Sequence, residues 1–353
     1  MRLSIVMLLS CLLLTGCATP LYLLKQGVGQ LSLRLRGTPN AEVLKDPAVS
    51  EEIKFKLRLI EDAKRFFEAT FSHEGGGIYS KTIFLDEKAV SWLVIASKPT
   101  EIEAIEHRFP IVGSFPYLGF YSKDDAQAFA RKLEEEELVT WMRPVYAYST
   151  LGYLEDRVLS SFFEYDEVEL VELIFHEMFH TLFFIKDEVE LNENLASFFA
   201  DKLLGLYYQD RPELKAYRRR VAAGEALNRE IVQLVTDLRG EFQKMRPYLT
   251  VERANEMSSR LVRELLLPLV RAYCDTHALE RCSDKEEDWN QARFAAIMSY
   301  ESEQEFLAEL YKSRAHPVEF LGALRKWYNE WKKSSQTDDF TTYLHQKAEQ
   351  ALP

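Results

Sequence analysis

The feature that most constrains this chain is a mostly apolar segment that carries two histidines and a glutamate. Residues 170–185 are rich in Leu, Ile, Val and Phe, so a helix formed from them should be buried in the core. Within it, His176 and His180 are four residues apart, and Glu177 follows the first histidine. Side chains at i and i+4 of a helix lie one above the other, so both imidazoles can face one ion. Burying these polar groups unsatisfied would be costly, which favours a bound cation.

The pattern His-Glu-x-x-His is typical of zinc hydrolases, in which the histidines hold the metal and the glutamate activates the hydrolytic water. The alternative is a pair of core histidines that are hydrogen-bonded to backbone or carboxylate groups. A hydrolytic zinc site needs three protein ligands and one open position. We expect Glu193 to be the third ligand, because a helix would fix it better than a loop fixes its rivals. Those rivals are Asp187, Glu188 and Glu190, which we expect to be solvated charges of the turn.

Two further kinds of residue are expected around such a site. The tetrahedral oxyanion needs a donor besides the metal, commonly a tyrosine or a histidine. The tyrosines considered for this role are Tyr146, Tyr148 and Tyr300. Metal-bound histidines also need partners for their second ring nitrogen. Ser197 and Asp201 share the expected helix of Glu193, but the sequence alone does not place them.

The N-terminus predicts a signal peptide over residues 1–16. Arg2 precedes an apolar run from Leu3 to Leu14, which is too short to span a bilayer. The run ends in Leu-Thr-Gly-Cys17, which resembles the lipobox of bacterial lipoproteins; the alternative is a secretory signal with an incidental cysteine. We expect cleavage before Cys17, acylation of its thiol and a tether over residues 17–40. Ala18 then favours the periplasmic face of the outer membrane.

Two cysteines lie in the body of the chain. Cys274 and Cys282 are close in sequence, and an oxidising envelope compartment favours a disulfide between them. Two buried free thiols are the alternative.

The remaining sequence predicts one α+β domain over residues 41–353, predominantly helical. Its 353 residues are 47% hydrophobic, enough for a sizeable core, and the net charge of −12 without a basic stretch excludes a nucleic-acid binder. We expect a small sheet in the part 41–165 and a helical part over 166–353. The expected helices cover 51–70, 122–137, 213–244, 260–273 and 303–331. The expected strands cover 90–96 and 109–121, and a further strand and turn are expected over 145–153.

Motifs spread over most of the chain carry a resemblance to a known family. They are Tyr22–Leu31, Ala41–Leu44, Phe109–Gly113, Gly119–Tyr121, Ala147–Tyr153, Ile174–Glu177 and Asn192–Glu193, with a fainter echo in Asn290–Arg293 and Tyr300. In these motifs the chain resembles the bacterial family of predicted aminopeptidases, which are zinc-dependent lipoproteins of the gluzincin type. The segment from Leu191 to Ala196 is also similar to the third-ligand helix of the alanyl aminopeptidases, where the gap after the second histidine is longer.

The resemblance implies a zincin-like fold with Zn²⁺ held by His176, His180 and Glu193, and Glu177 as general base. Phe179, Thr181 and Asn194 depart from the residues usual beside the zinc ligands, which bears on substrate preference.

The sequence leaves three functions open: an aminopeptidase, an endopeptidase and an inactive lipoprotein. An aminopeptidase would need a carboxylate for the substrate's α-amine, and Glu172, one turn before His176, is a candidate, although a solvated charge is the alternative. An endopeptidase would add its substrate as a strand along a segment such as 145–151. An inactive lipoprotein would bind a partner and turn nothing over.

Overall fold

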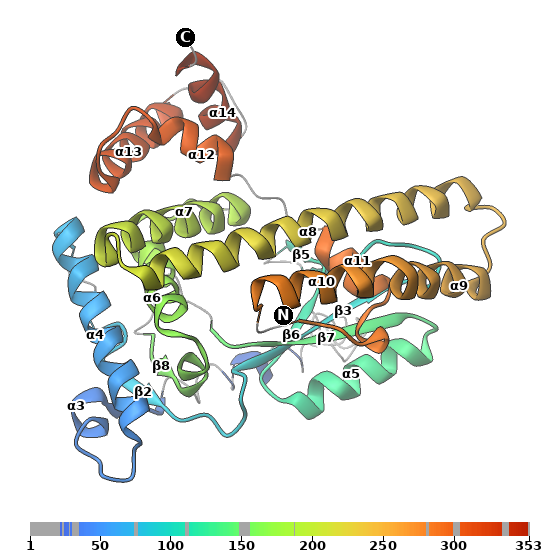
Figure 1. Cartoon of the computed structure of the whole chain (residues 1–353), viewed down its shortest axis with the longest axis horizontal. Helices are drawn as coiled ribbons and strands as arrows, with labels where there is room; N and C mark the ends of the chain where they lie inside the picture. The colour runs from blue at the N-terminus through green and yellow to red at the C-terminus, as the bar shows by residue number, and fades with distance from the viewer. Residues whose placement is uncertain are drawn as a thin grey trace, which may run out of the picture.

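The computed structural model describes residues 22, 25–27, 29, 35–73, 77–109, 113–147, 156–186, 188–279, 282–298, 304–333 and 339–351. In these ranges the fold is α+β and predominantly helical, with small sheets (Figure 1). As expected from the sequence, most of the chain after residue 166 is helical.

Three helices form the centre of the largest hydrophobic core. They are α4 (Glu51–Phe71), α6 (Glu167–Leu182) and α7 (Val189–Tyr208). Ser50 caps α4 by accepting a hydrogen bond from the Ile53 backbone, and its buried face includes Leu57, Ile60 and Phe67. Burial of such residues provides the main driving force for packing α4 against α6 and α6 against α7.

A small sheet lies at one side of this helical core. Its order is β1-β2-β8, with β2 and β8 parallel. The elements are β1 (Thr38–Pro39), α3 (Asn40–Val43), β2 (Lys81–Ile83), β8 (Val158–Leu159) and the 3-10 helix η1 (Ser160–Glu164). η1 leads directly to the start of α6, so the sheet and the histidine-bearing helix are adjacent in the chain.

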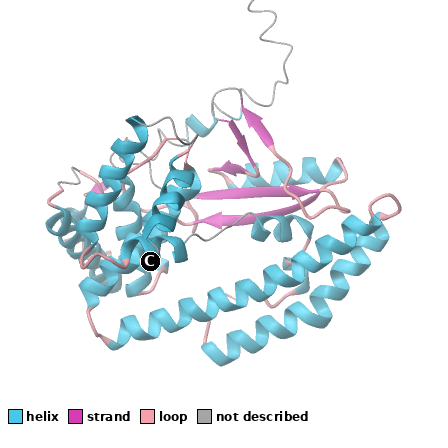
Figure 2. Cartoon of the chain, turned by 90° about the horizontal axis from the view of Figure 1, so that it is seen from above, coloured by secondary structure: helices cyan, strands magenta, loops and turns pink. Residues whose placement is uncertain are grey.

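A second, antiparallel sheet has the order β6-β3-β7 and packs against helices (Figure 2). Its elements are β3 (Ser91–Ser97), β6 (Leu118–Phe120), β7 (Val139–Val145), α5 (Lys123–Glu135) and α11 (Gln291–Met298); β4 (His107–Phe109) pairs with β5 (Gly113–Phe115). Ser122 caps α5 by accepting a hydrogen bond from Asp125 N.

One expected strand is misplaced. The sequence predicted a strand over 145–153, whereas the strand β7 ends at Val145, and residues 148–155 lie outside the described ranges. The sequence up to Val145 does not read as a strand, because Pro144 cannot donate a backbone hydrogen bond to a neighbouring strand. The structure accommodates Pro144 because β7 is an edge strand of the described sheet.

The long helix α8 (Pro212–Met245) runs antiparallel to a second long helical segment (Figure 2). That segment comprises α9 (Val251–Leu261), the π-helix η2 (Val262–Leu266) and α10 (Leu267–His277). A disulfide joins Cys274, in the last part of α10, to Cys282 beyond it, and the short 3-10 helix η3 (Glu286–Asp288) leads to α11.

Three C-terminal helices lie beside α7 (Figure 1). They are α12 (Gln304–Tyr311), α13 (Pro317–Lys333) and α14 (Phe340–Ala351). The helical range 303–331 therefore divides into two helices, with Pro317 at the start of the second, where proline is tolerated. Among the described residues, no helix combines the length and apolarity needed to cross a bilayer.

Candidate metal centre

The helix α6 presents His176, Glu177 and His180 from a well-defined start. Asp166 is its N-cap and accepts hydrogen bonds from Val168 N and Glu169 N, while the Glu169 side chain accepts from Asp166 N. This capping box satisfies backbone donors that the helix leaves unpaired. Beyond the cap, apolar side chains bury most of the helix, so its polar residues are held at fixed positions in a packed environment.

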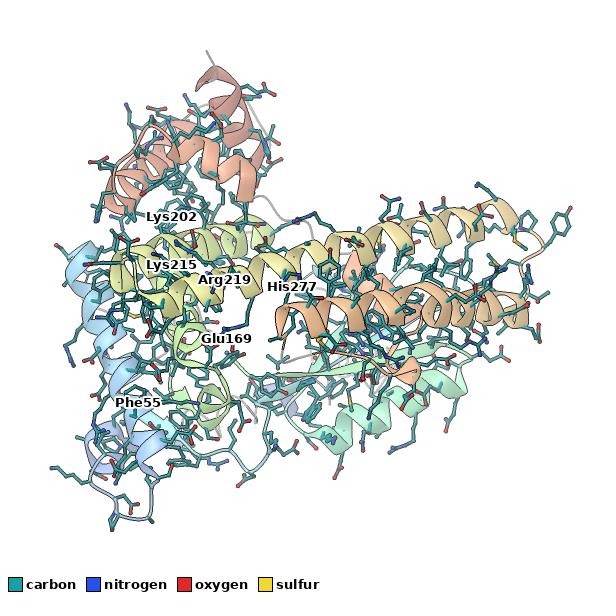
Figure 3. The ribbon with its side chains drawn as sticks, in the orientation of Figure 1. Phe55, Glu169, Lys202, Lys215, Arg219 and His277 are labelled. Carbon is teal, nitrogen blue, oxygen red and sulfur yellow. A yellow bond between two sulfur atoms is a disulfide. The ribbon has the colours of Figure 1, made fainter. Side chains whose placement is uncertain are left out.

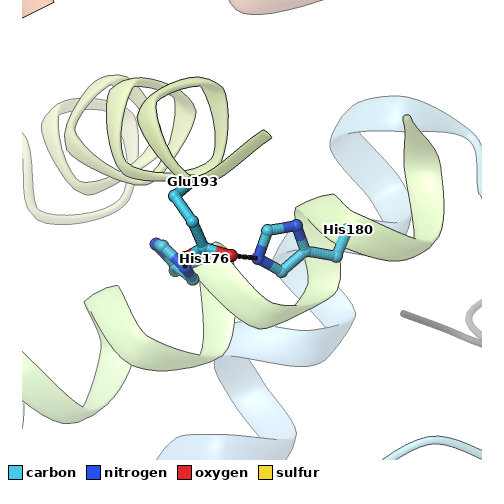
Figure 4. Close-up of side chains that lie close together, drawn as sticks. All are labelled: His176, His180 and Glu193. Atoms are coloured by element: carbon cyan, nitrogen blue, oxygen red, sulfur yellow. Dashed lines mark hydrogen bonds and ion pairs between the residues drawn. The ribbon is translucent and has the colours of Figure 1, made fainter. Parts of the chain in front are cut away.

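The turn from α6 to α7 is fixed by one buried amide. Asn192 is 1% exposed; its Oδ1 accepts from Ile185 N at 2.9 Å, and its Nδ2 donates to Ile185 O at 2.7 Å. The side chain therefore satisfies both backbone groups of a residue that precedes α7. The next residue, Glu193, lies near the start of α7 and faces back towards α6 (Figure 4).

The three expected ligands come together. Nε2 of His176 lies 3.2 Å from Oε2 of Glu193, and Nε2 of His180 lies 3.4 Å from Oε1 of the same carboxylate (Figure 4). One ligand atom from each residue lies within 4.8 Å of the other two. Two ligands of a tetrahedral zinc ion are about 3.3–3.5 Å apart, since the bonds are about 2.0–2.2 Å long. The two spacings between imidazole and carboxylate match this range, and the three residues together could hold a metal ion.

Burial differs among the three side chains, which leaves the cluster accessible on one side. The side chain of His180 is 3% exposed, that of His176 is 20% exposed and that of Glu193 is 46% exposed. The carboxylate thus lies at the more open end of the cluster. A hydrolytic metal site needs such an open position for water and substrate.

The protonation states also suit a cation. Burial, followed by the neighbouring His176, lowers the pKa of His180 to about 4. Burial opposes ionisation of Glu193, but the hydrogen bond from His176 and the two imidazoles lower its pKa. Burial also opposes protonation of His176, yet the hydrogen bond to Glu193 and nearby carboxylates raise its pKa. Neutral imidazole and carboxylate are the forms that bind metals, and a metal would replace the proton shared between His176 and Glu193.

The structure also places the two residues proposed as partners of the histidines. Oγ of Ser197 lies 3.3 Å from Nδ1 of His176. Asp201 instead accepts hydrogen bonds from Arg218, with Nη2 at 2.9 Å, and pairs with Lys202. Nδ1 of His180 is buried and has no hydrogen-bond partner in the part of the chain that the structure describes. Ser197 is therefore the partner that holds the ring of His176.

The rival ligand Glu188 has another role. Its carboxylate accepts hydrogen bonds from the backbone of Phe340 and Thr341, at the start of α14. Its interpretation as a solvated turn charge was therefore wrong, since the positive end of a helix dipole attracts a carboxylate. Glu190 is exposed, and Asp187 lies outside the described residues.

The structure describes two of the other residues that the sequence suggested for the site or the lipid anchor. Glu172 is half-buried and accepts a hydrogen bond from the hydroxyl of Tyr217 on α8, and burial raises its pKa, so it is not a fully solvated charge. The ring of Tyr146 packs edge-on against Tyr165. Three predicted residues, Cys17, Tyr148 and Tyr300, lie outside the described ranges.

Sequence reasoning missed Tyr79. This residue is 1% exposed and has a left-handed backbone conformation with φ of 54°. Burial, with the charges of Glu177 and Asp156, raises the pKa of its phenol well above the usual range. Its hydroxyl has no hydrogen-bond partner among the described residues. No periodicity or motif singles out a tyrosine after a glycine run, so only the fold reveals its position close to Glu177.

Fold and site together define a predominantly helical α+β protein with a His-His-Glu cluster on a helical hairpin. The family model described as "Putative aminopeptidase" matches residues 21–342. The chain belongs to this family, which supports a peptidase function. No curated protein and no solved structure matches the chain.

Proposed function

We propose that this protein is a zinc-dependent aminopeptidase in which His176, His180 and Glu193 hold the metal. The observation that carries the proposal is the convergence of two imidazole nitrogens and one carboxylate oxygen within 4.8 Å, from two helices. Placement of the third ligand on the following helix supports the gluzincin type and a zincin-like fold. Membership of the aminopeptidase family supports the reaction.

In the proposed mechanism, Glu177 is the general base. A zinc ion held by these three residues would polarise the scissile carbonyl and would lower the pKa of a water molecule bound to the zinc to about 7. Glu177 is 7% exposed and its charge raises the pKa of His176, so its carboxylate lies near the cluster and is shielded from bulk water. It accepts the proton of the attacking water and passes it to the leaving amine.

The choice between exopeptidase and endopeptidase is tested with one peptide in two forms. We expect cleavage of a peptide with a free N-terminus and loss of cleavage after N-terminal acetylation, because an aminopeptidase must bind the α-amine. Glu172 lies one helical turn before His176 on α6, is half-buried, and stays a candidate for this contact. Equal cleavage of both forms would establish an endopeptidase instead.

We further propose that the protein is a lipoprotein of the bacterial envelope, anchored in the bilayer through acylated Cys17. The support is the lipobox-like sequence that follows an apolar run. The change Cys17→Ser should move the protein from the membrane fraction to the soluble fraction. Continued sedimentation of this variant with membranes would exclude the lipid anchor.

A further inference from the structure

The C-terminal helices contact the candidate metal centre at three separate places. The centre consists of α6, which carries both histidines, the turn after it, and α7, which carries Glu193. Each of these three parts receives polar contacts from a different C-terminal helix. The three contacts are independent of the disulfide, the sheets and the long helix α8, and they lie at and on either side of the turn that joins the two ligand helices.

The first contact lies next to the third ligand. Gln304, the first residue of α12, donates its side-chain amide to the backbone oxygen of Asn194 at 3.0 Å, and the same nitrogen lies 3.3 Å from Asn194 Oδ1. Asn194 directly follows Glu193 and is 7% exposed. Gln304 therefore holds the backbone of α7 within one residue of the carboxylate ligand.

The second contact lies at the far end of the histidine helix. Nη2 of Arg325, on α13, donates to the backbone oxygen of Leu182 at 3.2 Å. Leu182 is the last residue of α6 and lies two residues after His180. A guanidinium group at this position satisfies a carbonyl that the helix itself leaves unpaired, and its positive charge suits the C-terminal end of the helix dipole.

The third contact lies in the turn between the two ligand helices. Glu188 accepts hydrogen bonds from the backbone of Phe340 and from Thr341 N at 3.3 Å, so the turn residue caps α14. The turn is thereby held from both sides, by Asn192 within the hairpin and by α14 outside it.

Aromatic packing joins the same surfaces. The ring of Phe199 on α7 stacks on Phe320 of α13 at 5.4 Å, and Phe183 packs edge-on against Tyr328 at 5.9 Å. Lys202 extends from α7 towards the C-terminal helices, with Nζ 5.8 Å from the ring centre of Tyr311 (Figure 3). These contacts make α12–α14 a continuation of the core around the ligand helices.

We infer that the helices α12–α14 are positioning elements of the metal centre, which fix the spacing between Glu193 and the two imidazoles through Gln304, Arg325 and Glu188. This inference rests on the proposed zinc site. A ligand set must be held within about 0.5 Å of its productive geometry, and changes to residues that support the ligands commonly alter metal affinity about 10–100-fold. The contacts at Leu182 and Asn194 act on the two ligand helices on either side of the turn that joins them.

The test measures zinc affinity of the full chain by competition with a chromophoric chelator. The variants are Gln304→Met and Arg325→Met, singly and together, because methionine keeps most of the packing volume and removes the donors. The control is Lys326→Met, on the same helix as Arg325 but with a side chain that is 75% exposed. We expect each single variant to weaken zinc binding about tenfold and the double variant to weaken it more, whereas the control stays within about twofold of wild type.

A second readout separates positioning from folding. Cobalt substituted for zinc reports ligand geometry in its visible spectrum, and we expect the double variant to change this spectrum while its far-ultraviolet circular dichroism stays that of wild type. If wild type binds zinc and the double variant binds it equally tightly with the same cobalt spectrum, the inference is wrong. If wild type binds no zinc, the proposed function itself fails.

Discussion

Ser197 on α7 places its hydroxyl oxygen 3.3 Å from Nδ1 of His176 on α6. Ser197 is four residues after Glu193, so one face of α7 provides both the third ligand and the support for the first histidine. Nε2 of the same ring is hydrogen-bonded to Oε2 of Glu193 at 3.2 Å; when a metal ion replaces the proton on Nε2, Nδ1–H can still donate to Ser197. The two helices are therefore linked on both sides of a single imidazole ring.

Removing this hydroxyl should loosen the metal. We expect Ser197→Ala to weaken zinc binding about tenfold, because partners of ligating histidines fix the ring orientation and its tautomer. The control is Ser259→Ala on α9, another half-buried helical serine, which should leave affinity unchanged. Chelator competition measures both. An unchanged dissociation constant for Ser197→Ala would show that the contact does not support the metal.

Glu177 should matter for chemistry but not for metal binding. The change Glu177→Gln keeps the size of the side chain and removes its capacity to accept a proton. We expect zinc content to stay at the wild-type level while kcat falls about 10²–10⁴-fold. Glu190→Gln, on the exposed start of α7, is the matched control and should retain activity. Substantial turnover by Glu177→Gln would assign the general base to another residue.

Asn192 should contribute strongly to stability. Its replacement by alanine leaves the buried N–H of Ile185 without its partner, and the C=O of Ile185 keeps only the longer hydrogen bond from Glu188 N at 3.4 Å. An unsatisfied buried group costs about 1–3 kcal/mol, so the free energy of unfolding in urea should fall by at least about 1 kcal/mol. Asn192→Asp should also destabilise, because it keeps the acceptor for Ile185 N but buries a carboxylate oxygen against the Ile185 carbonyl oxygen. A variant Asn192→Ala as stable as wild type would mean that the turn is fixed without this clamp.

Removal of the Tyr79 hydroxyl should not lower the stability of the protein, in contrast to the change at Asn192. Its buried hydroxyl has no partner among the described residues, so Tyr79→Phe removes an unsatisfied group and should leave the free energy of unfolding unchanged or raise it by about 1 kcal/mol. Tyr343→Phe is the contrast, because the hydroxyl of Tyr343 donates to Glu330 at 3.2 Å and its removal should destabilise. A clear loss of stability in Tyr79→Phe, measured by urea unfolding, would show that its hydroxyl does have a partner.

The local features of the fold were accessible from the sequence because they depend on neighbours in the chain. Ser50, Ser122 and Asp166 begin their helices as caps, and the spacing of His176 and His180 is set by one helical turn. The position of Glu193 required one further assumption, an antiparallel turn between two helices, and the described geometry satisfies it.

Features that depend on distant segments could not be predicted. Glu188 looked like a loop charge because its partner is α14, far along the chain. The same holds for Tyr79, whose electrostatic neighbours are Glu177 and Asp156. The strand β7 was misplaced because Pro144 is acceptable only at a sheet edge, and edge or centre is a property of the assembled sheet.

The proposed metal centre is tested most directly by the zinc content of the purified protein and of Glu193→Ala, with Glu190→Ala as the matched control. We expect about one zinc ion per chain for wild type and for the control, and a clear loss for Glu193→Ala, because that change removes one of three protein ligands. Wild-type protein without bound metal after zinc loading, or undiminished zinc in Glu193→Ala, would contradict the assignment of His176, His180 and Glu193 as the ligand set.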